Sequence, residues 1–137
     1  MSEVLLSIED RVAITELIAM HGHLVDSGRL DRLVELFTDD VVYDVSALGG
    51  DPLIGPGALR DAGLALGDNN PVGHHVTNTV ITEAAGDTVR ALSKAIGIMT
   101  DGTCGSSTYE DTVVRTDAGW RISHRRIVPH RKPLGRG

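Results

Sequence analysis

The chain has 137 residues, of which 41% are hydrophobic and 23% charged, values typical of one soluble globular domain. The single cysteine, Cys104, excludes an internal disulfide, and no apolar run approaches the ~20 residues of a membrane helix. The N-terminal residues are too few and too acidic for a signal peptide. We therefore expect one domain over residues 1–137, located in the cytoplasm.

The net charge is −6, but the basic residues gather at the C-terminal end. No acidic residue follows Asp117, and only Trp120 supplies an aromatic ring among the basic residues Arg121, Arg125, Arg126, Arg131, Lys132 and Arg136. Because stacking aromatics are missing and the rest of the chain would repel phosphate, we interpret this segment as a solvated strand end and tail. We expect no nucleic-acid partner and no membrane partner.

The first half of the chain predicts helices. Ser7 and Asp10 have the form of a capping box at the start of a helix. A mostly apolar stripe at helical spacing follows, made of Ile14, Leu17, Ile18, His21, Leu24 and Val25. Ser27 and Gly28 end this helix. A short second helix over 30–37 is predicted to end at residues 38–40, before a strand over 41–45. Pro56 favours the first turn of a third helix.

The second half predicts strands. Four runs over 72–83, 88–100, 106–115 and 119–128 are separated by short connections that contain Gly86, Gly102 and Gly119. Helices followed by an antiparallel meander indicate the α+β class, with helices packed on one face of a curved sheet. Residues 129–137 are expected to form a partly disordered tail.

Several polar residues lie within these apolar patterns, and a buried polar group without a partner costs roughly 1–3 kcal/mol. His21 lies within the apolar stripe of the first helix, where it either meets a core partner or lines a cavity. Asp26 lies off that stripe, so helical periodicity alone would leave it exposed. If such groups converge in one pocket, they form an acid–base site.

Strand alternation leaves other candidates open. His74 and His75 point to opposite faces, and we favour His74 as the inward residue because it shares a face with Val72, Val76, Asn78 and Val80. In the last strand, strict alternation does not favour Arg125 over His124 as the inward residue. A β-bulge would change which of the two side chains faces inward, so both remain candidates.

Signals for other chemistry are weak. The glycines lie in turns and match neither a P-loop nor a dinucleotide fingerprint, and Ser106 and Ser107 lack a nucleophile elbow. The adjacent His74 and His75 are not the i, i+4 pair of a zinc hydrolase. We expect neither a metal ion nor a cofactor.

The order of elements and several local strings resemble the SnoaL-like branch of the nuclear transport factor 2 superfamily. The matching strings are Ile14-Thr15-Glu16-Leu17, Asp26-Ser27-Gly28-Arg29-Leu30-Asp31, Leu36-Phe37-Thr38-Asp39-Asp40, His74-His75-Val76-Thr77-Asn78, Tyr109-Glu110-Asp111 and Gly119-Trp120-Arg121-Ile122. The resemblance implies a cone-shaped barrel, made of a strongly bent, mixed and mostly antiparallel sheet wrapped around N-terminal helices. It also implies a pocket at the wide end of the cone.

The resemblance implies roles for specific residues. Scytalone dehydratase and hexachlorocyclohexane dehydrochlorinase pair an aspartate after the first helix with a histidine on a long strand, which correspond to Asp26 and His74. Similarity to the dehydrochlorinase implies that three more residues of this chain correspond to residues of its pocket, namely Arg125, His21 and Tyr43. We therefore expect His74, Asp26 and Arg125 to be catalytic. Candidate substrate-binding residues are His21, Tyr43, Asp44, His75, Asn78, Tyr109 and His124.

Two departures from known relatives limit the activities that the resemblance implies. At the position of the base aspartate of ketosteroid isomerase this chain has Val45, and the nearest aspartate, Asp44, lies one residue earlier. The sequences around Tyr43 and Tyr109 also differ from those around the two pocket tyrosines of scytalone dehydratase. We expect a cofactor-independent lyase or isomerase that acts on a small apolar molecule. The alternatives are a polyketide cyclase or epoxide-opening hydrolase, and a non-catalytic ligand-binding or dimerisation module. The resemblance also implies a homo-oligomer, either a dimer or a trimer.

Overall fold

The structure, a computed structural model, describes residues 6–136. Within these residues, two α-helices and six strands form the α+β fold that the sequence predicts, joined by short 3-10 turns. The helices and strands are α1 (Ile8–Asp26), β1 (Phe37–Asp44), β2 (Leu53–Ile54), α2 (Pro56–Leu66), β3 (Gly73–Ala85), β4 (Thr88–Ile98), β5 (Cys104–Thr116) and β6 (Gly119–His130). The 3-10 turns cover Leu30–Glu35, Ser46–Leu48, Gly67–Asn69 and Pro133–Gly135.

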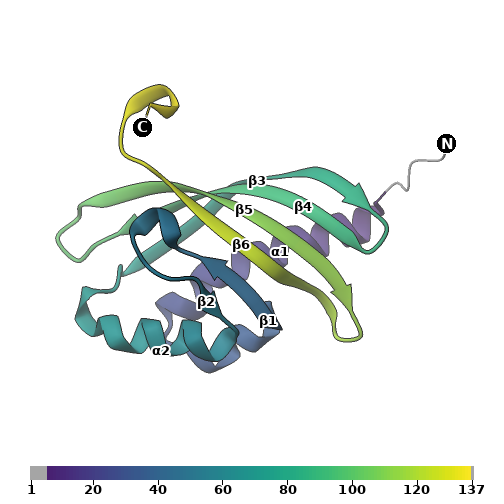
Figure 1. The fold of residues 1–137 in the computed structure, drawn as a ribbon, viewed down its shortest axis with the longest axis horizontal. Helices are drawn as coiled ribbons and strands as arrows, with labels where there is room; N and C mark the ends of the chain where they lie inside the picture. Colours follow the sequence, from purple (N-terminus) through teal and green to yellow (C-terminus); the bar gives the residue numbers. More distant parts are fainter. Residues whose placement is uncertain (1–5, 137) are drawn as a thin grey trace.

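The strands form one mixed sheet in the order β2-β1-β6-β5-β4-β3. Among the described strands, β1 and β6 alone pair in parallel, and the other neighbours are antiparallel. The sheet does not close into a barrel, since β2 and β3 form its edges in the part of the chain described. The long strands bend together over α1, and α2 lies beside the β1–β2 end (Figure 1). The interior between them holds the core and the site.

The first helix begins where the capping signal predicts. The Ser7 hydroxyl accepts a hydrogen bond from the Asp10 amide at 3.0 Å. The Asp10 carboxylate in turn accepts from Trp120 Nε1 at 3.0 Å and from Arg115 at 2.7 Å. The hydrogen bonds from Arg115 and Trp120 hold the pKa of Asp10 below its ordinary value. The start of α1 is thereby fixed to β5 and β6.

The core lies between α1 and the concave face of the sheet. Its most deeply buried large apolar residues are Ile14, Ile18, Phe37, Val41, Val89, Val113 and Ile122. The stripe predicted for the first helix is the side that packs inward. No helix in the described residues is both long enough and apolar enough to cross a membrane.

Several element boundaries differ from the prediction. The second helix is a 3-10 turn that stops at Glu35, and residues 37–40, predicted to end a helix, open β1 instead. Local propensity gives way there to pairing of Phe37 with Ile122 of β6. The two-residue strand β2 was not predicted. β6 extends to His130, so Pro129 and His130 of the expected tail are paired with β5.

Two irregular positions decide which side chains face inward. In β6 the pairing shifts so that Ser123 is extra, which places Arg125 on the concave side with Ile122 and Ile127. In β3 a second shift surrounds Asn78, whose φ is +56°. Val80 therefore turns outward and is 56% exposed. The prediction that Val80 shares a face with His74 is wrong, because it assumed unbroken alternation.

Candidate active site

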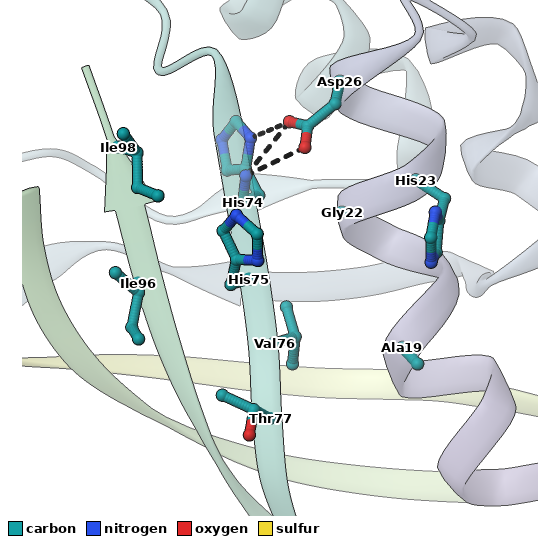
Figure 2. Close-up of a pocket in the computed structure, with 10 residues that line it drawn as sticks. All are labelled: Ala19, Gly22, His23, Asp26, His74, His75, Val76, Thr77, Ile96 and Ile98. Carbon is teal, nitrogen blue, oxygen red and sulfur yellow. Dashed lines mark hydrogen bonds and ion pairs between the residues drawn. The ribbon is translucent and has the colours of Figure 1, made fainter. Parts of the chain in front are cut away.

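The structure brings His74 and Asp26 together, although they lie 48 residues apart in the chain. His74 Nδ1 lies 2.6 Å from Asp26 Oδ1, and the two carboxylate oxygens also accept from the His74 backbone amide at 3.1 and 3.0 Å (Figure 2). β3 is an edge strand, so this amide has no neighbouring strand on its outer side. Asp26 thus fixes both the backbone and the ring of His74.

The short contact with Asp26 sets the proton on the His74 ring. An ionised carboxylate only accepts hydrogen bonds, so Nδ1 carries the hydrogen that it donates to Asp26. In the neutral ring, Nε2 is then left with a lone pair. The second ring nitrogen points away from Asp26 in Figure 2. The His74 side chain is 18% exposed, which leaves it accessible to a ligand.

His74 borders three hollows, of which the smallest measures about 180 Å³. An outer groove of about 570 Å³ runs between α1 and β3, and it is lined by Asp26, His74, His75 and the residues drawn in Figure 2. A central cavity of about 280 Å³ lies on the other side, between the helices and the concave face. Its lining is mostly aliphatic, and its polar residues are His21, Tyr43, Asn70, His74 and Tyr109. A cavity of this size suits a small, largely apolar molecule.

Arg125 is fully buried behind the central cavity. Its guanidinium donates to both carboxylate oxygens of Asp111, at 2.7 and 2.9 Å, and stacks 4.2 Å from the Tyr109 ring centre. Its third contact, at 3.2 Å, is with His21 Nδ1. Burial alone would lower the pKa of Arg125, but the charge and hydrogen bonds of Asp111 raise it above the ordinary value. Arg125 is therefore a permanent cation paired with a carboxylate.

The surroundings keep His21 and Tyr109 uncharged. Burial first, and then the neighbouring Arg125 charge, hold the pKa of His21 well below its ordinary value. Burial also raises the pKa of the Tyr109 hydroxyl well above its usual range. The polar residues of the cavity wall thus include a neutral imidazole and a neutral phenol at physiological pH.

Four predicted substrate-binding residues lie away from the central cavity. His75 points to the convex side and lines the outer groove, and exposed Asn78 accepts from the Thr77 hydroxyl. Asp44 accepts from the Ser46 amide at 2.9 Å on the outer side, and His124 lies near Arg126 in a separate surface hollow. Strand alternation explains why these four side chains face away from the cavity, because each residue is next to an inward-facing residue or to a bulge. Arg125 faces inward but does not itself line the cavity.

Two structural partners were missed by the sequence reasoning. Asp111 shares the inward face of β5 with Tyr109 and Val113, and an inward arginine in an apolar strand calls for such a counter-charge. Gly22 faces the His74 backbone so closely that any Cβ would overlap the His74 carbonyl oxygen. A glycine in the middle of a long helix is itself a signal of close approach.

No group of three or more histidine, cysteine, aspartate or glutamate side chains in residues 6–136 is arranged to hold a metal ion. The Asp26–His74 pair and the Asp111–Arg125–His21 chain are separate clusters. Both His21 and His74 line the central cavity, with 6.0 Å between their ring centres. This arrangement offers a proton acceptor and a hydrogen-bond donor at one hollow.

Comparisons with known proteins agree with this fold. The uncharacterised protein Rv2910c of Mycobacterium tuberculosis is 32% identical over 125 residues, which cover 86% of this chain and 84% of that protein. A structure of an NTF2-like protein with a cystatin-like fold from Novosphingobium aromaticivorans is 34% identical, with a TM-score of 0.76 and coverage of 95% of this chain and 86% of that chain.

A second structure from N. aromaticivorans, provisionally named a scytalone dehydratase, has a TM-score of 0.72 and covers 95% of this chain and 96% of its own. Its sequence identity is 22%, so this likeness concerns the fold alone. The family model of the SnoaL-like domain matches residues 6–126, nearly the whole described chain. With the bent sheet over α1, these matches show that the chain belongs to the SnoaL-like family of NTF2-like proteins.

Proposed function

We propose that the protein is a cofactor-independent lyase or isomerase that removes a proton from a small, mostly apolar molecule in the central cavity. The contact between His74 Nδ1 and Asp26 is the observation that carries this proposal. It leaves Nε2 of His74 with a lone pair that can accept a proton, and His74 lines the largely apolar central cavity. A positioned base of this kind contributes typically about 10²–10⁴-fold to the rate.

In the proposed reaction, His74 Nε2 takes a proton from a carbon that carries an activating group. The electron pair of the broken C–H bond forms a new C=C bond. In an elimination, a leaving group departs from the next carbon with its own electron pair, and the imidazolium returns the proton to it. In an isomerisation, the π pair of the original C=C bond takes the proton back from the imidazolium at a different carbon, so that the double bond moves. Asp26 stabilises the imidazolium charge between the two steps.

The position of Asp26 favours His74 rather than Asp26 as the base. Both carboxylate oxygens accept hydrogen bonds from His74, and Asp26 lines the outer groove rather than the central cavity. An epoxide-opening or cyclase reaction in which Asp26 acts directly would need that carboxylate to face the substrate. The non-catalytic alternative needs the hollow but assigns no role to the hydrogen-bonded pair.

The test is a panel of small β-hydroxy ketones, β-halo ketones and β,γ-unsaturated ketones, followed by the gain of absorbance of the conjugated enone product or by mass. We expect turnover of at least one class by the wild type and a loss of about 10²-fold or more in His74→Ala. Asp26→Asn should also lose turnover, because an amide does not stabilise the imidazolium. His75→Ala, one residue away on the convex side, is the matched control and should keep it. Full turnover by His74→Ala would refute the proposal.

A further inference from the structure

We propose that His21 is a second catalytic residue, which donates a hydrogen bond from Nε2 to a neutral oxygen of the ligand. The ligand class is then a small uncharged carbonyl compound. This inference rests on the proposed function for its chemical step. The hydrogen-bond chain from Asp111 through Arg125 to His21 carries the argument.

The hydrogen position on His21 follows from its partner. A guanidinium has only donors, so the 3.2 Å contact requires His21 Nδ1 to accept from Arg125. A neutral imidazole whose Nδ1 accepts must carry its hydrogen on Nε2. Asp111 holds the guanidinium through two hydrogen bonds, so Arg125 has one fixed orientation from which to donate. His21 is therefore a fixed donor, and Arg125 is a positioning residue.

The two histidines of the site have opposite hydrogen positions. Asp26 accepts from Nδ1 of His74 and leaves an acceptor at Nε2, whereas Arg125 donates to Nδ1 of His21 and leaves a donor at Nε2. Both rings line the central cavity, with centres 6.0 Å apart. No hydrogen bond joins the two rings in the described residues. A base and a donor thus flank a space that a small ligand can enter.

The charges around the cavity define the ligand. No lysine or arginine among the described residues lines the cavity, and the charge of Arg125 behind it is paired with Asp111 and separated from the cavity by His21. An anionic ligand would lose its hydration without meeting a free cation, which is costly in an apolar enclosure. A neutral oxygen, by contrast, needs only the donor that His21 supplies.

The donor completes the proposed step. As His74 removes the proton next to a carbonyl group, the C–H electron pair forms a C=C bond and the carbonyl π pair moves onto oxygen. His21 Nε2–H donates to that oxygen and stabilises the enolate, in the manner of an oxyanion hole. When the enolate reverts to the carbonyl, its electrons expel a β-hydroxyl as hydroxide, which takes the proton from His74 and leaves as water. The balance is the loss of one water molecule.

Binding of three probes tests the donor without any turnover. 2-Acetylnaphthalene presents a neutral carbonyl oxygen that only accepts hydrogen bonds, naphthalene has no oxygen, and 2-naphthoate carries a charge. We expect the wild type to bind 2-acetylnaphthalene better than 2-naphthoate. The ratio of 2-acetylnaphthalene affinity to naphthalene affinity should fall about five- to tenfold in His21→Phe, as for the loss of one hydrogen bond. His21→Gln keeps a neutral N–H donor and should restore the ratio.

His74→Ala should keep the preference for 2-acetylnaphthalene, because a ketone oxygen has no hydrogen to donate to His74, so failure of the proposed base and failure of the proposed donor give different results. If His21→Phe does not fold, nitrogen NMR of histidine-labelled wild type reads the two rings directly. We expect hydrogen on Nε2 of His21 and on Nδ1 of His74. An unchanged affinity ratio in folded His21→Phe, or hydrogen on Nδ1 of His21, would overturn the inference.

Discussion

The Cα of Gly22 faces the backbone carbonyl oxygen of His74 so closely that a Cβ at position 22 would overlap it. Gly22 lies one turn before Asp26 on the same side of α1, so the helix and β3 approach each other at the point where Asp26 meets His74. A residue without a side chain thus sets the distance on which the candidate base depends. Its cost in helix propensity, about 0.5–1 kcal/mol relative to alanine, is offset by this contact.

Gly22→Ala should therefore destabilise the protein, although alanine is the better helix former. The methyl group must push β3 away from α1, and overpacking of this kind costs about 1–3 kcal/mol. The shift should also lengthen the Asp26–His74 contact and lower any turnover. Denaturant unfolding and the substrate panel measure the two effects.

Gly57→Ala is the matched control, since a Cβ there meets nothing within 4 Å. This exposed position lies in the first turn of α2, and alanine should leave the stability unchanged or raise it by up to about 1 kcal/mol. Equal stability of Gly22→Ala and the wild type would show that the helix and strand are free to separate.

Much of the fold was predictable because local signals agree with one another. The cap at Ser7, the helical stripe that contains His21 and the glycine turns between strands each fixed an element to within a few residues. The inward direction of Arg125 was not predictable. It depends on the bulge at Ser123, and a bulge leaves no clear signal in alternation.

The candidate site was predictable only in part. Asp26 lies off the apolar stripe of its helix, and it became a candidate by resemblance alone. The sequence does not reveal that Asp26 reaches the edge of β3, because that contact depends on where a strand 48 residues away is placed. The ion pair between Arg125 and Asp111 likewise depends on the register between β5 and β6, which the sequence does not reveal.

Breaking the buried ion pair should be costly. Asp111→Asn leaves the guanidinium of Arg125 enclosed without a counter-charge, and removal of one partner from such a pair typically costs about 3–5 kcal/mol. The double variant Asp111→Leu/Arg125→Met removes both charges and should lose less than the single variant. Thermal and denaturant unfolding of the three proteins provide the comparison, and a double variant less stable than Asp111→Asn would contradict it.

The free energy of unfolding should decrease as the pH is lowered, because of His21. Because its folded pKa is held well below the ordinary value, the folded protein resists protonation while the unfolded chain takes up a proton below pH ~6.5. This contribution is complete above that pH and is lost as the pH falls further. Between pH 7.5 and 5.5, the wild type should lose roughly 1 kcal/mol more unfolding free energy than His21→Gln. Parallel stability curves for the two proteins would rule out a buried, neutral His21.

The apolar side of α2 should control access to the central cavity. Ala62 lines the cavity, whereas Ala65, three residues on, is exposed and does not. Ala62→Phe places a ring in a hollow of about 280 Å³ and should abolish 2-acetylnaphthalene binding while the protein stays folded, since the side chain fills existing space. Ala65→Phe adds the same ring on the solvent side and should leave binding unchanged. Equal effects of the two substitutions, measured by fluorescence titration, would show that ligands bind elsewhere, with the outer groove beside His74 as the next place to test.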